Sequence, residues 1–254
     1  MKTSLSEEAT REISGRLHEA NSDFAKKYPG ESGRRQPVHT VYGGAHLFKS
    51  DSARRLGELA RRSLEQFAPD SLTFARAIGL PGSETLPDAL DESSEIAARL
   101  YVTPDSVRGE NKALWLAHTI YHRVVDKLRR EAVEDFRIDF EDGYGNRPDQ
   151  EEDGHAEVAA REVATGVKEK TLPPFIGIRI KPLTEELRTR SLRTLDIFIS
   201  TLCAETGNRL PENFVVTLPK VVMPEQVAAL ADVFDLLERE IGLASGSLKM
   251  ELMI

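Results

Sequence analysis

The sequence contains only one cysteine, no long apolar run and no excess of basic residues. A single cysteine, Cys203, permits no internal disulfide, and its apolar helical surroundings favour a buried thiol in a reducing, cytoplasmic setting. No stretch approaches the roughly 20 apolar residues of a membrane span, and residues 1–15 lack the apolar core of a signal peptide. These absences argue against a secreted or membrane-embedded protein.

The net charge of the chain indicates which classes of partner it can bind. The chain of 254 residues carries a formal net charge of -8. Such an excess of acidic residues disfavours nonspecific binding to nucleic acid or to an anionic membrane, although a local basic pocket for a small anion is compatible with it. We therefore expect a small-molecule partner, no nucleic acid and no membrane.

The first half of the chain shows helical patterns interrupted by polar segments. An amphipathic helix is predicted over 5–28, inside an N-terminal helical extension of residues 1–35. A polar segment with Pro and Gly then leads into a larger domain over 36–254. Residues 68–134 are predicted to be a helical insertion in that domain, ending in a long helix from residue 111.

Five short β-rich runs alternate with helical patterns in the larger domain. The runs lie at 38–42, 136–141, 175–180, 214–218 and 248–254. Helices are predicted at 51–67, 155–170, 185–205 and 224–241, with Asp51 as a possible cap and Gly242 suited to a helix end. This alternation is typical of parallel βα units. It fits either an incomplete (β/α)₈ TIM barrel, with about five of its eight units, or a smaller doubly wound open sheet.

Acidic residues are concentrated where the second run ends. Asp139 and Glu141 point to the same side of an extended chain, and Asp142 begins the following turn. In a barrel, this carboxyl end of the strand is where active sites lie. Three converging carboxylates suit a hard cation such as Mg²⁺, bound directly or through water. The alternative is an acidic strand end that caps the next helix or pairs with nearby Arg and Lys.

Basic residues occupy the ends of the next two runs. Arg179 and Lys181 are predicted to share one face of the third run, and Lys220 follows the fourth. The planar guanidinium of Arg179 suits a substrate carboxylate, or else an ion pair with Glu141 or Asp142.

Two further candidates are weaker. Gly44, after the first run, could approach a substrate through its backbone N–H, or could simply belong to a tight loop. His118 and His122 have the i,i+4 spacing of metal ligands but lack the glutamate of an HExxH motif, which favours ordinary histidines at the edge of a core.

Taken in order, the segments Asp139–Asp142, Ile178–Leu183 and Leu218–Val222 resemble the citrate lyase β-subunit-like family of aldolases, in particular a larger uncharacterised subgroup. The likeness covers roughly 135–254, with weaker similarity over 38–67. It implies a TIM-barrel, Mg²⁺-dependent carbon–carbon lyase acting on a 2-oxo acid, a hydroxy-dicarboxylate or its coenzyme A ester through a metal-stabilised enolate.

The resemblance also implies roles for individual residues. Glu141 and Asp142 would support Mg²⁺ through water and take part in catalysis, and Arg179 would bind the substrate's carboxylate and enolate oxygens. Lys220 and Gly44, from their positions at strand ends, are further candidates for contact with the substrate. The direct metal ligands would lie beyond Ile254, so the chain is expected to be truncated, and Glu251 is not expected to replace them. Two alternatives are an inactive homologue that serves as a binding or assembly module, and a homo-oligomer in which a second copy completes the fold.

Overall fold

The structure, a computed structural model, describes residues 4–30, 33–91 and 94–254. Residues 31–32, in the polar segment after the predicted extension, and 92–93, in the predicted insertion, lie outside these ranges. The chain divides into two compact units, Met1–Gln36 and Pro37–Ile254. The division falls one residue from the boundary expected from the sequence.

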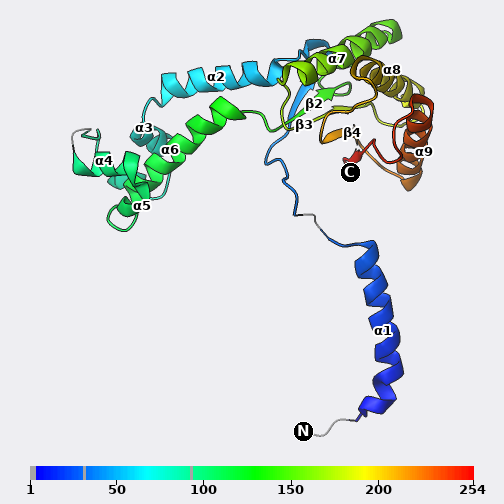
Figure 1. The fold of residues 1–254 in the computed structure, drawn as a ribbon, viewed down its shortest axis with the longest axis horizontal. Coiled ribbons are helices and arrows are strands. Elements are labelled where there is room, and N and C mark those ends of the chain that lie inside the picture. The colour runs from blue at the N-terminus through cyan, green and yellow to red at the C-terminus, as the bar shows by residue number, and fades with distance from the viewer. Residues whose placement is uncertain (1–3, 31–32, 92–93) are drawn as a thin grey trace. The chain divides into compact units, whose positions relative to one another are not determined.

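The first unit contains α1 (Glu7–Lys27), the helix expected over 5–28 (Figure 1). The Ser6 side chain accepts a hydrogen bond from the Ala9 amide at 3.2 Å, which caps the first turn. Glutamates in the first turn and lysines in the last turn complement the helix dipole. No residue of α1 is buried. The helix is therefore stabilised locally, by its cap and its charges, within this unit.

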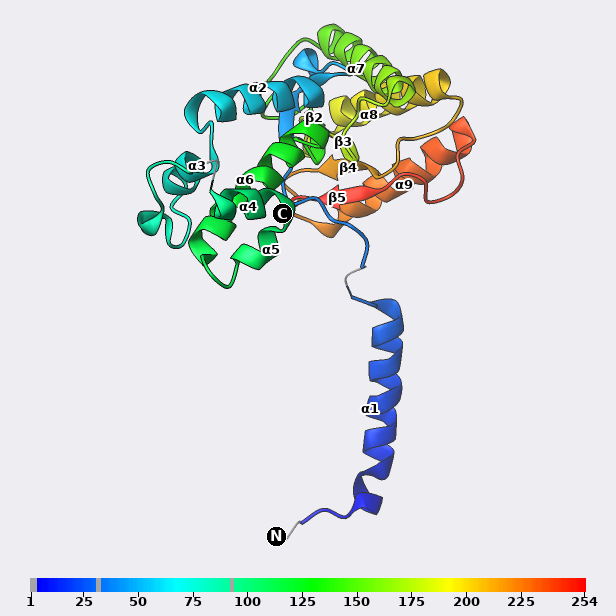
Figure 2. The same ribbon diagram turned by 60° about the vertical axis from the view of Figure 1, so that its left-hand side comes forward.

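The second unit is built on a parallel five-stranded sheet, which confirms the five predicted strands and the α/β class. The strands are β1 (Val41–Gly44), β2 (Asp135–Asp139), β3 (Phe175–Arg179), β4 (Phe214–Leu218) and β5 (Met250–Leu252). They are hydrogen-bonded in the order β1-β2-β3-β4-β5, and Figure 2 shows β5 beside β4. A doubly wound sheet reverses its strand order at a switch point. The observed order has no such point, so the doubly wound alternative is wrong.

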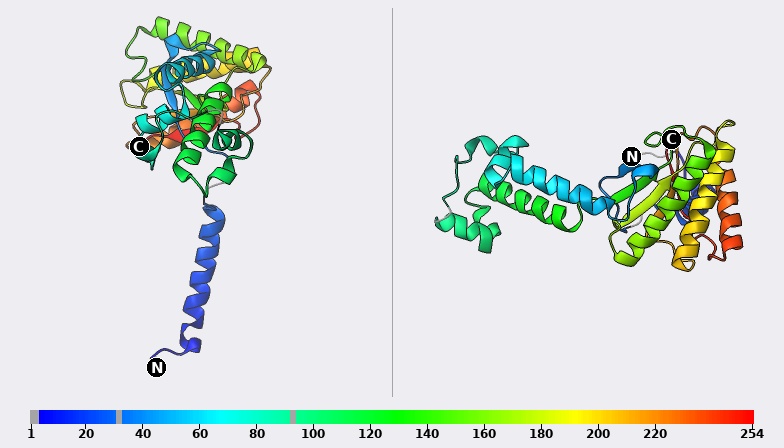
Figure 3. Two further views of the ribbon diagram at one scale, coloured as in Figure 1. Left: turned by 90° about the vertical axis from the view of Figure 1, so that its left-hand side faces the viewer. Right: turned by 90° about the horizontal axis from the view of Figure 1, so that it is seen from above.

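Helices follow the strands and cover one face of the sheet. They are α7 (Asp149–Glu169), α8 (Arg188–Thr206) and α9 (Pro224–Ile241), which lie together in Figure 3. Alternate residues of β2, β3 and β4 point toward them and form one apolar core with the helices. The strand residues of this core include Phe136, Ile138, Ile176, Ile178, Phe214, Val216 and Leu218. Burying each such side chain contributes about 1.5–3 kcal/mol, so this face stabilises the sheet.

The opposite face of the sheet carries polar and charged side chains that are nevertheless buried. Asp135, Arg137 and Asp139 alternate with the apolar residues along β2, and Arg179 and Thr217 lie on β3 and β4. Sheets covered by helices on both faces read as continuous apolar runs. Here only the face that packs against α7, α8 and α9 is apolar. The buried charges of the opposite face need partners from neighbouring strands.

The expected insertion forms a helical region with a core of its own. It contains α3 (Ser71–Ala77), α4 (Glu95–Val102), α5 (Pro104–Val107) and α6 (Lys112–Arg130), and α6 contacts α2 (Ser52–Phe67), the helix expected after the first strand. Helices α2 and α6 lie side by side, as the right-hand view of Figure 3 shows. A second core joins α3 to α6 through Leu72, Ala75, Leu100, Val107, Leu114 and Ala117. The helices of this region can therefore hold together without contributing to the sheet.

The helix ends follow the sequence at most positions. Pro224 opens α9, and Gly242 ends it with a left-handed φ of 84°, as expected. Asp51 does occupy the cap position of α2, but its side chain makes no capping hydrogen bond. Its carboxylate instead pairs with Arg55 at 2.9 Å and Arg54 at 3.3 Å. The arginines of the first turns compete for the carboxylate, which corrects the predicted cap.

Candidate active site

The carboxyl ends of the strands bring the candidate residues together. Strand register places Gly44, Asp139, Arg179, Thr217 and Glu251 in one row across the sheet. Because parallel strands all end at the same edge, residues that follow each strand also meet there. The row and the loops just beyond it form the site described below.

Asp139 and Arg179 make the central contact of this site. Arg179 donates from Nε to Asp139 Oδ1 at 2.8 Å and from Nη2 to Oδ2 at 2.5 Å. The two carboxylate oxygens also accept hydrogen bonds from the Glu141 amide at 2.9 Å and the Gly143 amide at 2.7 Å. Burial raises the pKa of Asp139, but these hydrogen bonds outweigh it, and the pKa lies below its ordinary value. Asp139 is therefore a buried, ionised anchor for Arg179.

Glu141, Asp142 and Lys220 extend the cluster from the strand ends. Glu141 Oε2 lies 3.2 Å from Arg179 Nη1, and its other oxygen is ion-paired with Lys220 Nζ. Lys220 also donates to Asp142 Oδ1 at 3.0 Å. Its contacts with Glu141 and Asp142 raise the pKa of Lys220 above its ordinary value. Four of the residues expected at the site thus lie in one cluster in which positive and negative side chains alternate: Arg179, Glu141, Lys220 and Asp142.

The backbone at Lys220 supports this placement. Its φ of 54° lies in the left-handed region, which is uncommon for a residue with a side chain. The residue follows Pro219 directly after β4, and the turn lets a half-exposed ammonium group reach the loop after β2. A strained conformation that is held in place by its contacts is typical of a functional position.

Gly44 lies at the end of β1, beside the loop that follows β2. A Cβ atom at this position would stand 2.4 Å from the Gly143 carbonyl oxygen. A glycine is therefore needed here, because the two backbones approach closely. This close packing is what the tight-loop alternative for Gly44 predicts. Strand register also sets Gly44 beside Asp139 in the row, where the predicted substrate contact would have to form.

Lys181 does not share the face of Arg179, so that expectation is wrong. β3 ends at Arg179, and the alternation of side chains ends with it. Lys181 Nζ instead lies 2.8 Å from Glu152 Oε2 on α7 and donates to the Phe140 carbonyl at 2.6 Å. The side chain joins the helix layer to the sheet and takes no part in the cluster around Arg179.

A second set of charges on the same face was missed from the sequence. Arg137 lies between Asp135 and Glu251, and its Nε donates to Glu251 Oε2 at 3.0 Å and to Thr217 at 3.1 Å. Burial raises the pKa of Glu251, but the Arg137 and Thr217 contacts outweigh it and hold the pKa below its ordinary value. The alternation of charge in residues 135–139 was the available signal. Glu251 is thus a member of this network, paired with Arg137 and Thr217.

The fit of the site to Mg²⁺ rests on Glu141 and Asp142. Among the residues that the structure describes, no three His, Cys, Asp or Glu side chains are grouped to hold a metal ion. Both Glu141 oxygens are buried and form ion pairs, one with Arg179 and one with Lys220, that lack hydrogen-bond geometry. The Asp142 carboxylate also pairs with the Lys220 ammonium group. Carboxylate oxygens are the donors that Mg²⁺ prefers, often through its own waters. The pair thus offers oxygens of the kind that Mg²⁺ prefers, with both carboxylates already paired to cations of the cluster.

Sequence comparison places the chain in a family. A model described as Domain of unknown function (DUF6986) matches residues 17–254. The chain belongs to this family. No curated protein and no solved structure matches the chain. The DUF6986 description names no activity.

An aromatic and histidine group borders the site of this DUF6986 chain. Tyr144, in the loop after β2, is hydrogen-bonded through its Oη to His155 Nδ1 at 2.8 Å, and the His46 ring lies 5.6 Å from the Tyr144 ring. Burial raises the pKa of Tyr144 to about 12. Burial likewise lowers the pKa of His46, with Arg147 adding to the effect. Both side chains are therefore neutral near pH 7.

His118 and His122 lie in the middle of α6 and take no part in the site. Their ring centroids are 4.2 Å apart, and Tyr101 packs edge-on against both. His118 is 7% exposed, and neither of its ring nitrogens has a hydrogen-bond partner. Burial lowers the pKa of His118 to about 4. The favoured interpretation, histidines at the edge of a core, agrees with this packing.

None of the helices in the described part of the chain combines the length and apolar character needed to cross a bilayer.

Proposed function

We propose that this protein is a Mg²⁺-dependent carbon–carbon lyase of the aldolase and citrate lyase type. The observation that carries the proposal is the cluster of Arg179, Asp139, Glu141, Asp142 and Lys220 at the carboxyl ends of parallel strands. In this proposal the five strands are consecutive strands of a (β/α)₈ barrel. The sequential strand order, the outer layer of helices and the charged inner face support it.

The substrate would be a small carboxylate: a 2-oxo acid, a hydroxy-dicarboxylate or its coenzyme A ester. Asp139 engages Nε and Nη2 of Arg179, which leaves Nη1 facing Glu141 at the strand ends. A substrate carboxylate or enolate oxygen would accept a hydrogen bond from Nη1. The Lys220 side chain is 56% exposed, and its ammonium group would supply a second contact for the anion; the Gly44 backbone would border the bound molecule.

The chemistry required is stabilisation of negative charge at a carbonyl oxygen next to the bond that breaks. Fixed cations in a partly buried site provide this at no cost of reorganisation during the reaction. Mg²⁺ held through water by Glu141 and Asp142 would add positive charge at the same place. Asp139 contributes by fixing the guanidinium of Arg179, and Glu141 contributes by orienting both cations.

The test is cleavage of malyl- and citramalyl-type substrates, as free acids and as coenzyme A thioesters, with and without Mg²⁺. Removing one fixed donor to a developing oxyanion typically costs about 10²–10³ in rate. We expect a loss of this size for Arg179→Lys and a smaller loss for Lys220→Ala. Lys249→Ala, at an exposed position directly before β5, is the control. Wild-type rates in folded Arg179→Lys and Lys220→Ala would contradict the proposal.

The second candidate is a binding or assembly module, and a groove at β1 favours it. The groove has a volume of about 320 Å³ and is lined by β1, the start of α2 and the turn between them. Leu47 and Leu59 on its wall are 70% and 55% exposed, and β1 pairs with β2 alone among the described strands. A second copy of this chain could cover such a groove. Mass photometry of wild type and Leu59→Glu would test this, because loss of a dimer only in the variant would support it.

A further inference from the structure

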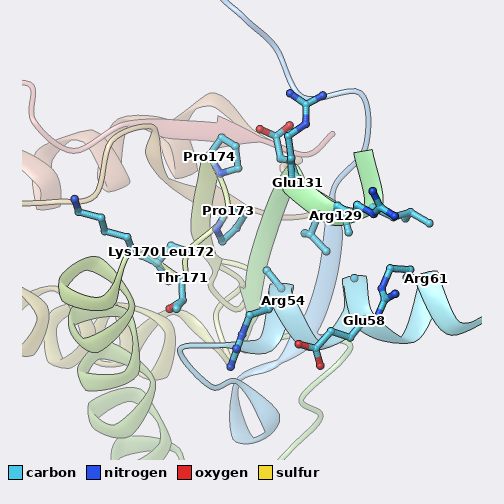
Figure 4. A pocket seen from close by; sticks show the side chains of 16 residues that line it. Arg54, Glu58, Arg61, Arg129, Glu131, Lys170, Thr171, Leu172, Pro173 and Pro174 are labelled. Carbon is cyan, nitrogen blue, oxygen red and sulfur yellow. The ribbon is translucent and has the colours of Figure 1, made fainter. Parts of the chain in front are cut away.

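A separate cavity of about 600 Å³ lies at the other end of the sheet, where β2 and β3 begin (Figure 4). Three segments line it: the first half of α2, the end of α6 with the residues up to Val133, and the turn from Lys170 to Pro174. Val133 and Pro174 precede β2 and β3, whereas the cluster around Arg179 follows them. The cavity is therefore independent of the proposed active site.

The charge of the cavity is opposite to that of the chain. Five cationic side chains line it against only Glu58 and Glu131, in a protein of net charge -8. The cations are Arg54, Arg61, Arg129, Arg130 and Lys170. Such a local excess in an acidic protein attracts anions to one place.

Three of these cations are not used within the described structure. Arg54 and Arg61 pair with Asp51 and Glu65. No ion pair or hydrogen bond links Arg129, Arg130 or Lys170 to a side chain in residues 4–30, 33–91 or 94–254. Arg129 and Arg130 end α6, and Lys170 ends α7 with a left-handed φ of 57°.

Helix dipoles do not account for the whole excess. Basic residues in a last helical turn favourably offset the dipole, and each helix end is equivalent to about half a negative charge. The ends of α6 and α7 together therefore offset about one positive charge. With the ion-paired Arg54, Arg61 and Glu131 set aside, the three remaining cations against Glu58 leave a net charge of +2, so a surplus of about one charge remains.

The wall of the cavity is apolar and already formed. Leu128, Leu172, Pro173 and Pro174 contribute to it. Gly57 allows α2 to approach α6, because a Cβ there would lie 2.8 Å from the Ala132 Cβ and 3.3 Å from the Leu128 carbonyl. The hydroxyl of Thr171 donates to the Ser50 carbonyl at 2.6 Å and fixes the turn before β3. The cavity volume lies within the usual range of small-molecule sites, about 300–1,000 Å³.

We propose that this cavity binds a small, multiply charged anion that carries phosphate groups on a less polar body. The guanidinium groups of Arg129 and Arg130 match phosphate oxygens in a planar, two-pronged geometry, and the ammonium group of Lys170 adds a point charge. The apolar wall contacts the body of the ligand. The inference goes beyond the proposed lyase activity and depends on none of its residues.

Isothermal titration calorimetry of the full chain with pyrophosphate and with ATP, both without divalent metal, tests the site. Arg129→Gln/Arg130→Gln removes two lining cations. Arg62→Gln/Arg123→Gln is the matched control. It removes one exposed arginine from α2 and one from α6, and neither residue lines the cavity. Circular dichroism confirms that each variant is folded.

We expect saturable binding of both ligands, tighter for ATP because its body contacts the wall. The lining variant should weaken binding at least tenfold, and the control should change it less than twofold. Failure of both ligands to saturate at millimolar concentration would overturn the proposal. So would equal weakening in the two double variants, because binding would then reflect diffuse surface charge.

Discussion

Asp139 binds Arg179 through both carboxylate oxygens and, with the same two oxygens, accepts the amides of Glu141 and Gly143. One buried carboxylate thus neutralises a guanidinium on the neighbouring strand and shapes the loop that carries Glu141 and Asp142. The site depends on this residue although Asp139 itself is fully buried.

Asp139→Asn should therefore destabilise the fold. Breaking a buried ion pair by removing one partner typically costs about 3–5 kcal/mol, because the remaining charge stays buried. Asp142→Asn, whose side chain is 66% exposed, should cost less than about 1 kcal/mol. Urea unfolding of the two variants measures both values. Equal free energies of unfolding for Asp139→Asn and Asp142→Asn would show that the ion pair between Asp139 and Arg179 does not stabilise the fold.

Acid should destabilise the protein partly through Asp139 and Glu251. Both have folded pKa values below their ordinary 3.8 and 4.5. The unfolded chain then binds more protons, so the stabilisation is complete above about pH 5 and is lost as the pH falls through and below these values. Urea unfolding at pH 5.5 and 3.5 should show a smaller loss in Glu251→Gln than in wild type. Glu169→Gln, an exposed control, should lose as much as wild type.

His118 should produce a second pH dependence at milder acidity. Its folded pKa of about 4 lies below the ordinary 6.5, so the unfolded chain takes up the proton first as the pH falls. The stabilisation is complete above pH 6.5 and declines toward pH 4, by roughly 2–3 kcal/mol. Unfolding of His118→Leu should lack this decline, whereas His18→Leu, exposed on α1, should retain it. An unchanged profile in His118→Leu would refute the assignment.

Gly177 should tolerate no side chain. A Cβ on this β3 residue would lie 2.1 Å from the Val215 carbonyl oxygen, so the backbone of β4 would have to move. We expect Gly177→Ala to cost several kcal/mol, at or above the 1–3 kcal/mol typical of overpacking. Gly154→Ala, on α7 with nothing within 4 Å, should instead stabilise by about 0.5–1 kcal/mol. Thermal unfolding compares the two, and similar melting temperatures would contradict the steric argument.

The local elements of this protein follow from its pattern of apolar and polar residues. Alternating and helical patterns predict all five strands and the main helices, because the period of apolar residues reflects which face is buried. The same patterns place Glu141, Asp142, Arg179 and Lys220 at strand ends. Parallel strands end at one edge, so their convergence follows from the fold class alone.

The pairing of side chains, in contrast, depends on how the strands are arranged in three dimensions. Arg137 meets Glu251 from 114 residues away, and Lys181 leaves the face of Arg179 to reach Glu152. Strand order, likewise, separated a sequential sheet from a doubly wound one. These outcomes depend on the register between distant strands and on the reach of long, flexible side chains. The local periodicity of a sequence contains no information on register or on side-chain reach. It indicates the face on which a residue lies, but not the partner that the residue contacts there.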